Sequence, residues 1–171
     1  MVRIRKMADD DVDAVAEIRI TGWRTAYRGL VPDAYLDAMD PAADAAAHRA
    51  RRATAEYPMV ELVAESPADG VVGWACLGPC RDDDVPAPAG ELYALYVRPA
   101  LVGTGVGRAL CAGALEGARE RGDARLGLWV LRENARARRF YARAGFAADG
   151  AERVDVVEGE PVVEVRYVRG V

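Results

Sequence analysis

Apolar residues recur with two different spacings along the chain, and each spacing predicts a different kind of element. Val12, Val15 and Ala16 begin a series with three- and four-residue steps, which is typical of an amphipathic helix. Short apolar or alternating runs, such as V-R-I-R at residues 2–5, predict strands instead. Helices are expected at residues 12–27, 32–36, 41–53, 105–121 and 134–144, and strands at residues 2–5, 59–64, 71–77, 91–97, 124–131, 154–157 and 162–168.

The order of these elements predicts an α/β (α+β) fold on one mixed sheet of about seven strands, with helices on both faces. Residues 91–97 are mostly apolar, as expected of a central strand. Residues 78–90 contain three prolines and three adjacent aspartates and are predicted to form a loop. The chain has 171 residues, the usual size of one domain, so we expect residues 1–171 to fold as a single unit.

Composition and charge exclude several classes of protein. The formal net charge is −4, which disfavours a sequence-independent grip on nucleic acid. No stretch approaches the roughly 18 uncharged residues of a spanning helix, so no membrane association is expected. A metal site is not expected, because His48 is the one histidine and there is no C-x-x-C pair. His48 is predicted to lie on the surface and Cys111 to fill the core. The odd number of cysteines predicts a reducing, cytoplasmic environment.

A glycine-rich segment lies between the predicted central strand and the helix at residues 105–121. Glycine lets the backbone turn tightly there, and the first N–H groups of a helix have no acceptor within the helix. Such N–H groups bind anions, so a phosphate or diphosphate is the expected ligand. The alternative is a turn that only packs against a neighbouring segment. The segment consists of Gly103, Thr104, Gly105, Val106, Gly107 and Arg108.

Two common phosphate-binding motifs do not fit this segment. A Walker A loop has Lys-Ser or Lys-Thr after its last glycine, whereas Gly107 is followed by Arg108 and Ala109. A dinucleotide fingerprint needs G-x-G-x-x-G, and Arg108 occupies its third required position. The acidic residue Asp123 precedes the next strand, whereas the ribose-binding carboxylate lies at that strand's far end. A nucleotide-dependent oxidoreductase or kinase is therefore a poor match.

Longer segments taken together resemble a known family. V-R-P-A-L-V-G-T-G-V-G-R-A-L at residues 97–110, L-W-V-L-R-E-N-A-R-A-R-R-F-Y-A-R-A-G-F at residues 128–146 and the C-terminal hairpin are similar to the GNAT superfamily of acyl-CoA-dependent N-acetyltransferases. T-G-W-R-T-A-Y-R-G-L-V-P-D-A-Y-L-D at residues 21–37 resembles one bacterial subgroup. The resemblance covers nearly the whole chain. It departs at Val102, where Arg or Gln is usual, and this departure predicts altered packing in the loop, not lost binding.

The resemblance implies the acyl-CoA N-acyltransferase fold, splayed between its fourth and fifth strands, and acetyl-CoA as the cofactor. By analogy, backbone N–H groups of residues 95–97 hold the acetyl carbonyl and residues 102–108 hold the diphosphate. Asn134 would bond the pantetheine arm or a nearby backbone group. Arg136 and Arg139 either add charge at the phosphates or face solvent. The implied cofactor-binding residues are Leu95, Tyr96, Val97, Val102, Gly103, Thr104, Gly105, Val106, Gly107, Arg108, Asn134 and Tyr141.

The implied reaction is direct attack of a primary amine, on a small molecule or a peptide, on the acetyl thioester. Tyr141 occupies the position at which the family places a tyrosine that donates to the coenzyme sulfur, but it also falls on a buried stripe with Phe140. Glu91 lies six residues before Val97, the spacing of the general base in the histone-acetylating branch. A strand-end ion pair is the alternative role for Glu91. The alternative for the whole chain is acyl-CoA binding or sensing without turnover.

Aromatic residues near the N-terminus are the candidates for the acceptor side. Trp23, Tyr27 and Tyr35 lie in the segment that walls the acceptor groove in this family, and residues 82–84 are three aspartates on a loop beside it. Aromatic rings with nearby carboxylates suit a cationic amine, although aromatic residues at helical spacing are also common in cores. The expected partners are the amine acceptor and, in a homodimer, a second copy of the chain.

Overall fold

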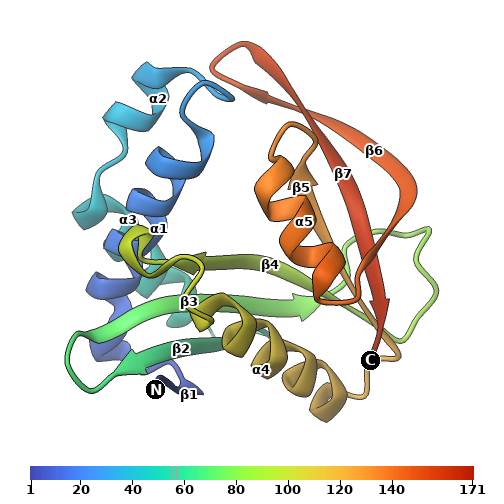
Figure 1. Cartoon of the computed structure of the whole chain (residues 1–171), viewed down its shortest axis with the longest axis horizontal. Coiled ribbons are helices and arrows are strands. Elements are labelled where there is room, and N and C mark those ends of the chain that lie inside the picture. The colour runs from blue at the N-terminus through green and yellow to red at the C-terminus, as the bar shows by residue number, and fades with distance from the viewer. Residues whose placement is uncertain (55, 57) are drawn as a thin grey trace.

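Seven strands form one mixed sheet in the computed structural model of the chain, which describes residues 1–54, 56 and 58–171. The strands lie in the order β1-β2-β3-β4-β5-β7-β6 (Figure 1), and every neighbouring pair is antiparallel except β4 and β5. This is the predicted mixed sheet. Its strands are β1 (Arg3–Lys6), β2 (Val60–Ser66), β3 (Gly70–Pro79), β4 (Ala89–Val97), β5 (Arg125–Leu131), β6 (Ala147–Val157) and β7 (Glu160–Gly170).

Helices cover both faces of the sheet, as predicted. On one face α1 and α3 pack on the central strands, and Val15 and Ala45 belong to the same buried cluster as Val63. On the other face α4 contributes Leu110 to a larger buried cluster, against which Phe140 of α5 also packs. The helices are α1 (Val12–Tyr27), α2 (Asp33–Ala38), α3 (Pro41–Arg52), α4 (Val106–Arg121) and α5 (Ala135–Arg143), with short 3-10 turns η1 (Asp9–Asp11) and η2 (Pro99–Leu101).

The parallel strands β4 and β5 pair only at their beginnings and then separate. Residues 89–91 pair with residues 125–127, whereas β4 continues to Val97 and β5 to Leu131. On its other side, β4 stays paired with β3 as far as Val97. The two strands therefore diverge in space (Figure 1), which confirms the predicted splay between the fourth and fifth strands.

Glycine and asparagine fix the ends of the two helices that follow the gap. Gly105 and Gly122 flank α4 with φ angles of 100° and 83°, a region that glycine enters without steric cost. Asn134 caps α5, because its side-chain oxygen accepts a hydrogen bond from the Ala137 N–H at 3.1 Å. Gly145 follows α5 with a φ angle of 86°. These local signals made the boundaries of both helices predictable.

Several predicted strand boundaries were wrong. β3 extends to Pro79 and β4 begins at Ala89, so the predicted loop at residues 78–90 is shorter. β6 begins at Ala147, well before residue 154. The side chains of β6 are mostly exposed because it is an edge strand, and its register with β7 shifts between Ala148 and Glu152 around Gly150. A strand of this kind shows no regular alternation of apolar residues.

The prediction that His48 lies on the surface was also wrong. Its side chain is buried, and its Nε2 lies 2.6 Å from Oε1 of Glu61 on β2. Arg52, one turn further along α3, binds the other oxygen of the same carboxylate. The buried Glu61 carboxylate needs such partners. The sequence around His48 does not indicate this contact, because Glu61 lies on β2, outside the helix that carries His48. Cys111 is buried, as predicted. No helix in the described ranges has both the length and the apolar character needed to cross a membrane.

Candidate functional site

The edge of β4 that faces the gap carries main-chain N–H groups without a partner strand. The Arg98 N–H donates to the Val72 carbonyl of β3 at 2.9 Å, and successive N–H groups of a strand point to opposite edges. The N–H groups of Leu95 and Val97 therefore point into the gap, whereas that of Tyr96 points toward β3. Of the three residues predicted to hold a carbonyl oxygen, two present their N–H groups in the gap.

β4 is also irregular where it begins to leave β5. Leu77 pairs with Leu92 and Cys76 pairs with Ala94, so Tyr93 has no counterpart on β3. One extra residue on a strand turns the following side chains and peptide groups relative to the neighbouring strand. The irregularity thus contributes to the divergence of β4 from β5.

The first turn of α4 presents N–H groups that no protein atom in the described ranges accepts. The first N–H within the helix to find a carbonyl is that of Ala109, which donates to Gly105 at 3.0 Å. The preceding N–H groups, at residues 105–108, make no such bond among the described residues. A Cβ atom added at Gly103 or Gly105 would meet nothing within 4 Å, so the space before the helix is open. This arrangement fits an anionic group.

Two members of the predicted anion-binding loop donate elsewhere. The Val102 N–H donates to the Pro99 carbonyl at 3.2 Å, and the Thr104 N–H donates to the Leu101 carbonyl at 3.3 Å. These bonds close successive turns and are available because the loop continues η2. The set of N–H groups free to bind an anion is therefore smaller than residues 102–108 would supply, and these groups lie at the start of α4. The Val102 side chain is exposed.

Three tyrosines from different elements meet beside the gap. Tyr27 of α1 and Tyr96 of β4 lie close enough for each side chain to influence the pKa of the other. Burial raises the pKa of both and also that of Tyr141 on α5, which lies close enough to influence Tyr96. The Tyr141 ring packs edge-on against Phe140 and Phe146, with centroids 5.0 and 5.8 Å away. Each hydroxyl therefore keeps its proton at neutral pH and can donate it.

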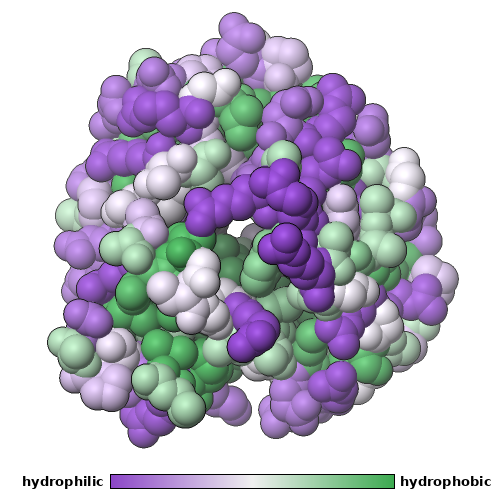
Figure 2. All heavy atoms as spheres, in the orientation of Figure 1, coloured by the Kyte–Doolittle hydropathy of each residue, from purple (hydrophilic) through white to green (hydrophobic). Residues whose placement is uncertain are grey.

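Several arginines on α4, on α5 and just after β4 have no carboxylate partner among the described residues. Elsewhere in the described ranges many arginines form ion pairs, such as Arg166 with Asp84. α5 lies beside the first turn of α4, because a Cβ atom added to Gly107 would lie 3.5 Å from the Phe140 ring of α5. Figure 2 shows a hollow in the centre of this face, with hydrophilic side chains along its rim and hydrophobic ones deeper. The arginines for which the described residues provide no ion pair here are Arg98, Arg108, Arg136, Arg139 and Arg143.

Glu91 lies where β4 and β5 begin to separate, and its carboxylate is bound by Arg81. The Glu91 side chain is buried, and its Oε1 lies 2.5 Å from the Arg81 Nη2. Oε2 accepts from the Arg81 Nε at 3.1 Å and from its main-chain N–H at 3.2 Å. The ion pair considered as the alternative is thus present. The role of Glu91 as a general base stays a prediction, and it requires Arg81 to move aside before water can deliver a proton.

Replacing Glu91 by glutamine tests this prediction. Glutamine keeps the size and one acceptor oxygen but cannot take up the proton, so we expect kcat at neutral pH to fall by about 100-fold, with the KM for acetyl-CoA unchanged. Steady-state kinetics with thiol detection measure both constants. Arg81→Gln is the matched control, because it breaks the same ion pair and leaves the carboxylate. Equal losses of kcat and melting temperature in the two variants would leave Glu91 a purely structural role.

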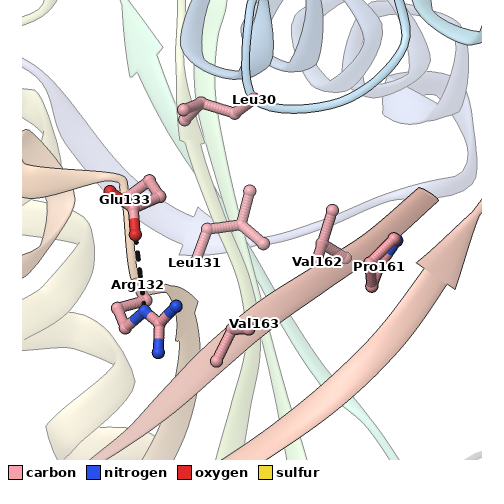
Figure 3. A pocket seen from close by; sticks show the side chains of 7 residues that line it. All are labelled: Leu30, Leu131, Arg132, Glu133, Pro161, Val162 and Val163. Carbon is pink, nitrogen blue, oxygen red and sulfur yellow. Dashed lines mark hydrogen bonds and ion pairs between the residues drawn. The ribbon is translucent and has the colours of Figure 1, made fainter.

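The predicted aromatic wall lies on the opposite side of the gap from α4. The Trp23 and Tyr27 rings pack edge-on with centroids 4.6 Å apart, in a cluster with Leu131 and Val162. A cavity of about 130 Å³ opens beside this cluster. Figure 3 shows Leu30, Leu131 and Val162 around it. No local pattern of residues indicates this cavity, because its walls come from the α1–α2 turn, the end of β5 and the start of β7.

The aspartates of the β3–β4 loop are used within the protein. Asp82 accepts from the Trp129 indole N–H at 2.9 Å, and the two oxygens of Asp84 each lie 2.7 Å from Arg166. Asp149 of β6 binds the same guanidinium at 2.7 Å. These contacts fasten the loop to β5 and β7. The expectation that residues 82–84 attract a cationic acceptor is therefore not supported for Asp82 and Asp84.

Comparisons with known proteins agree with this geometry. The family model described as Acetyltransferase (GNAT) family matches residues 18–146. The uncharacterized N-acetyltransferase YuaI of Bacillus subtilis is 28% identical over 134 residues, which cover 78% of this chain and 74% of that protein. Mycothiol acetyltransferase of Beutenbergia cavernae is 50% identical over 60 residues, but these cover 35% of this chain and only 20% of that protein.

Solved structures share the fold over nearly the whole chain. The PaiA N-acetyltransferase of Thermoplasma acidophilum, in complex with coenzyme A, has a TM-score of 0.72 at 20% identity and covers 100% of this chain and 99% of its own. YncA of Salmonella typhimurium, solved with acetyl-CoA, has a TM-score of 0.72 at 24% identity, with 99% and 93% covered.

Proposed function

Because this chain belongs to the GNAT acetyltransferase family, we propose that it binds acetyl-CoA and transfers the acetyl group to a primary amine of a small molecule or a peptide by direct attack. The observation that supports the proposal is the presence of two sets of main-chain N–H groups without a protein acceptor among the described residues. One set lies in the first turn of α4 and the other on the gap-facing edge of β4. The first suits a diphosphate and the second suits a carbonyl oxygen that gains charge.

The chain's own residues suit both ends of this cofactor. The N–H groups of residues 105–108 would hold the diphosphate. Arg108 and the arginines of α5 would add positive charge near the cofactor's phosphate groups. Asn134 uses its side-chain oxygen to cap α5, so its amide N–H₂ group is the part left to bond the pantetheine arm. The gap between β4 and β5 would take this arm, because the two strands do not pair with each other beyond residues 91 and 127.

When bound, acetyl-CoA supplies an activated acetyl group: the amine nitrogen bonds to the carbonyl carbon, and the bond from that carbon to sulfur breaks. The N–H groups of Leu95 and Val97 would stabilise the negative charge on the carbonyl oxygen. Tyr141 would give its hydroxyl proton to the departing thiolate, and because burial raises its pKa the hydroxyl is protonated when the reaction begins. The proton of the attacking amine leaves to water or to a carboxylate. No covalent acyl-enzyme is required.

Binding of the cofactor is tested by thermal unfolding. A ligand that binds only the native state raises its stability by RT ln(1 + [L]/Kd), about 2.7 kcal/mol at a concentration 100 times Kd. We expect acetyl-CoA to raise the melting temperature, and NAD and ATP at the same concentration to leave it unchanged. Stabilisation by all three, or by none, contradicts the proposal.

Turnover is tested separately, by thiol release with a panel of amines. We expect release of coenzyme A that depends on both acetyl-CoA and an amine, with an acetylated amine as the second product. Stabilisation by acetyl-CoA without amine-dependent thiol release identifies the alternative, an acyl-CoA-binding protein without turnover.

A further inference from the structure

Glu164 of β7 is a carboxylate on the acceptor side of the gap. It pairs with Leu131 of β5 and with Arg153 of β6 in the sheet register. Residues two apart on a strand share a face, so Glu164 lies on the same face as Val162. Val162 and Leu131 line the 130 Å³ cavity beside it, together with Leu30, Pro161, Val163 and the charged residues Arg132 and Glu133. The Glu164 side chain is only 19% exposed, so it is set into this surface.

One oxygen of this carboxylate is engaged and the other is not. Oε2 accepts from the Arg153 Nε at 2.6 Å. Oε1 has no hydrogen-bond donor among the described residues. The Arg153 guanidinium itself lies over the Trp129 ring, 4.4 Å from its centroid, and this contact fixes the direction from which it holds Glu164. A carboxylate with one oxygen fixed and the other free is oriented to accept from a ligand.

The charged groups around Glu164 leave this free oxygen uncompensated. Arg166, two residues further along the same face, is bound to Asp84 and Asp149. Arg132, on the turn after β5, lies 3.4 Å from Glu133 and 3.8 Å from Glu152. On the α1 side, the charge of Glu164 is one of the causes that raise the pKa of Tyr27, which places the carboxylate within electrostatic range of that tyrosine. Arg153 is therefore the one cation in direct contact with Glu164 among the described residues.

We propose that Glu164 binds the amino group of the acceptor, and that the cavity beside it, lined by Leu30, Leu131 and Val162, takes the adjoining hydrocarbon chain. The inference rests on the proposed function and narrows it. The acceptor class is an aliphatic primary amine that arrives as an ammonium ion, because an ammonium group satisfies the free carboxylate oxygen and an alkyl chain satisfies the apolar wall. Glu164 thereby becomes a specificity-determining residue.

The test uses Glu164→Gln with n-butylamine as the acceptor. Glutamine keeps the shape but removes the charge, so we expect the KM for n-butylamine to rise by about 10- to 100-fold, as for the loss of a hydrogen bond to a charged group. The KM for acetyl-CoA and the melting shift that it causes are expected to stay as in the wild type. Glu164→Asp keeps the charge and is expected to recover part of the affinity for the amine.

Glu160→Gln is the matched control. Glu160 is an exposed carboxylate at the start of the same strand, so its loss changes the net charge equally without touching the cavity lining. We expect wild-type constants for this variant. An unchanged KM for n-butylamine in Glu164→Gln overturns the inference, as does an equal rise in Glu160→Gln. So does a wild-type preference for arylamines, which are uncharged at neutral pH. In each of these cases acetyl transfer itself still occurs, whereas absent binding of acetyl-CoA overturns the proposed function instead.

Discussion

Tyr141→Phe is expected to lower kcat by about 10³-fold while the affinity for acetyl-CoA stays as in the wild type. The substitution removes only the hydroxyl group, so the packing of the ring against Phe140 and Phe146 is kept. Without a proton donor, the thiolate has to leave as an anion. The losses are therefore expected in the step that breaks the carbon–sulfur bond. Thiol-release kinetics measure kcat, and thermal shift measures the affinity.

The pH profile gives a second measurement on Tyr141. Burial raises the pKa of this tyrosine well above its ordinary value, so its protonated form persists as the pH rises toward 10. The acceptor amine loses its proton over the same range. We therefore expect the wild-type rate to increase with pH without a descending limb below about pH 10. A descending limb near neutral pH would point to a different acid.

Tyr167→Phe is the control for the loss of a buried tyrosine hydroxyl. Its hydroxyl accepts from the Arg138 Nε at 3.2 Å, on β7 away from the gap. We expect a lower melting temperature, since one hydrogen bond of about 1 kcal/mol is lost, but an unchanged kcat. A Tyr141→Phe variant that turns over at the wild-type rate would remove Tyr141 from the reaction and leave it a packing residue.

The sequence predicts best where the cause of a structure is local. Gly105 and Gly122 mark the ends of α4 because only glycine takes their φ angles readily, and Asn134 marks the start of α5 because its side chain caps the helix three residues on. The unused N–H groups at the start of α4 follow from the same local rules. These features needed no knowledge of the tertiary fold, and the structure contains each of them.

The sequence predicts poorly where a side chain depends on a distant partner. Arg166 and Asp84 are 82 residues apart, and only the pairing of the β3–β4 loop with β7 brings them together. His48 was placed on the surface because nothing in its own helix points to Glu61. Glu164 was overlooked for the same reason, since its importance comes from the cavity beside it. The one signal within its strand was the alternation that places it on the same face as Val162.

Gly107→Glu is expected to stabilise the fold and abolish useful binding of acetyl-CoA at the same time. Glycine inside a helix costs about 1 kcal/mol relative to better helix formers, and a carboxylate in the first turn interacts favourably with the helix dipole. A Cβ atom at this position would meet the Phe140 ring and the Val97 side chain no closer than 3.5 Å, which is ordinary contact. We therefore expect a higher melting temperature without ligand.

The same carboxylate would stand where the cofactor's diphosphate is proposed to bind. Two like charges about 4 Å apart repel by about 4 kcal/mol at an effective dielectric constant of 20, which corresponds to about a 10³-fold weaker affinity. Gly107→Gln separates charge from bulk, because it has the same length and no charge, so a smaller loss is expected there. The melting shift caused by acetyl-CoA measures all three proteins. Wild-type affinity in Gly107→Glu would mean that the N–H groups of α4 do not hold the diphosphate. A carboxylate among those N–H groups would repel a diphosphate bound there and weaken its binding.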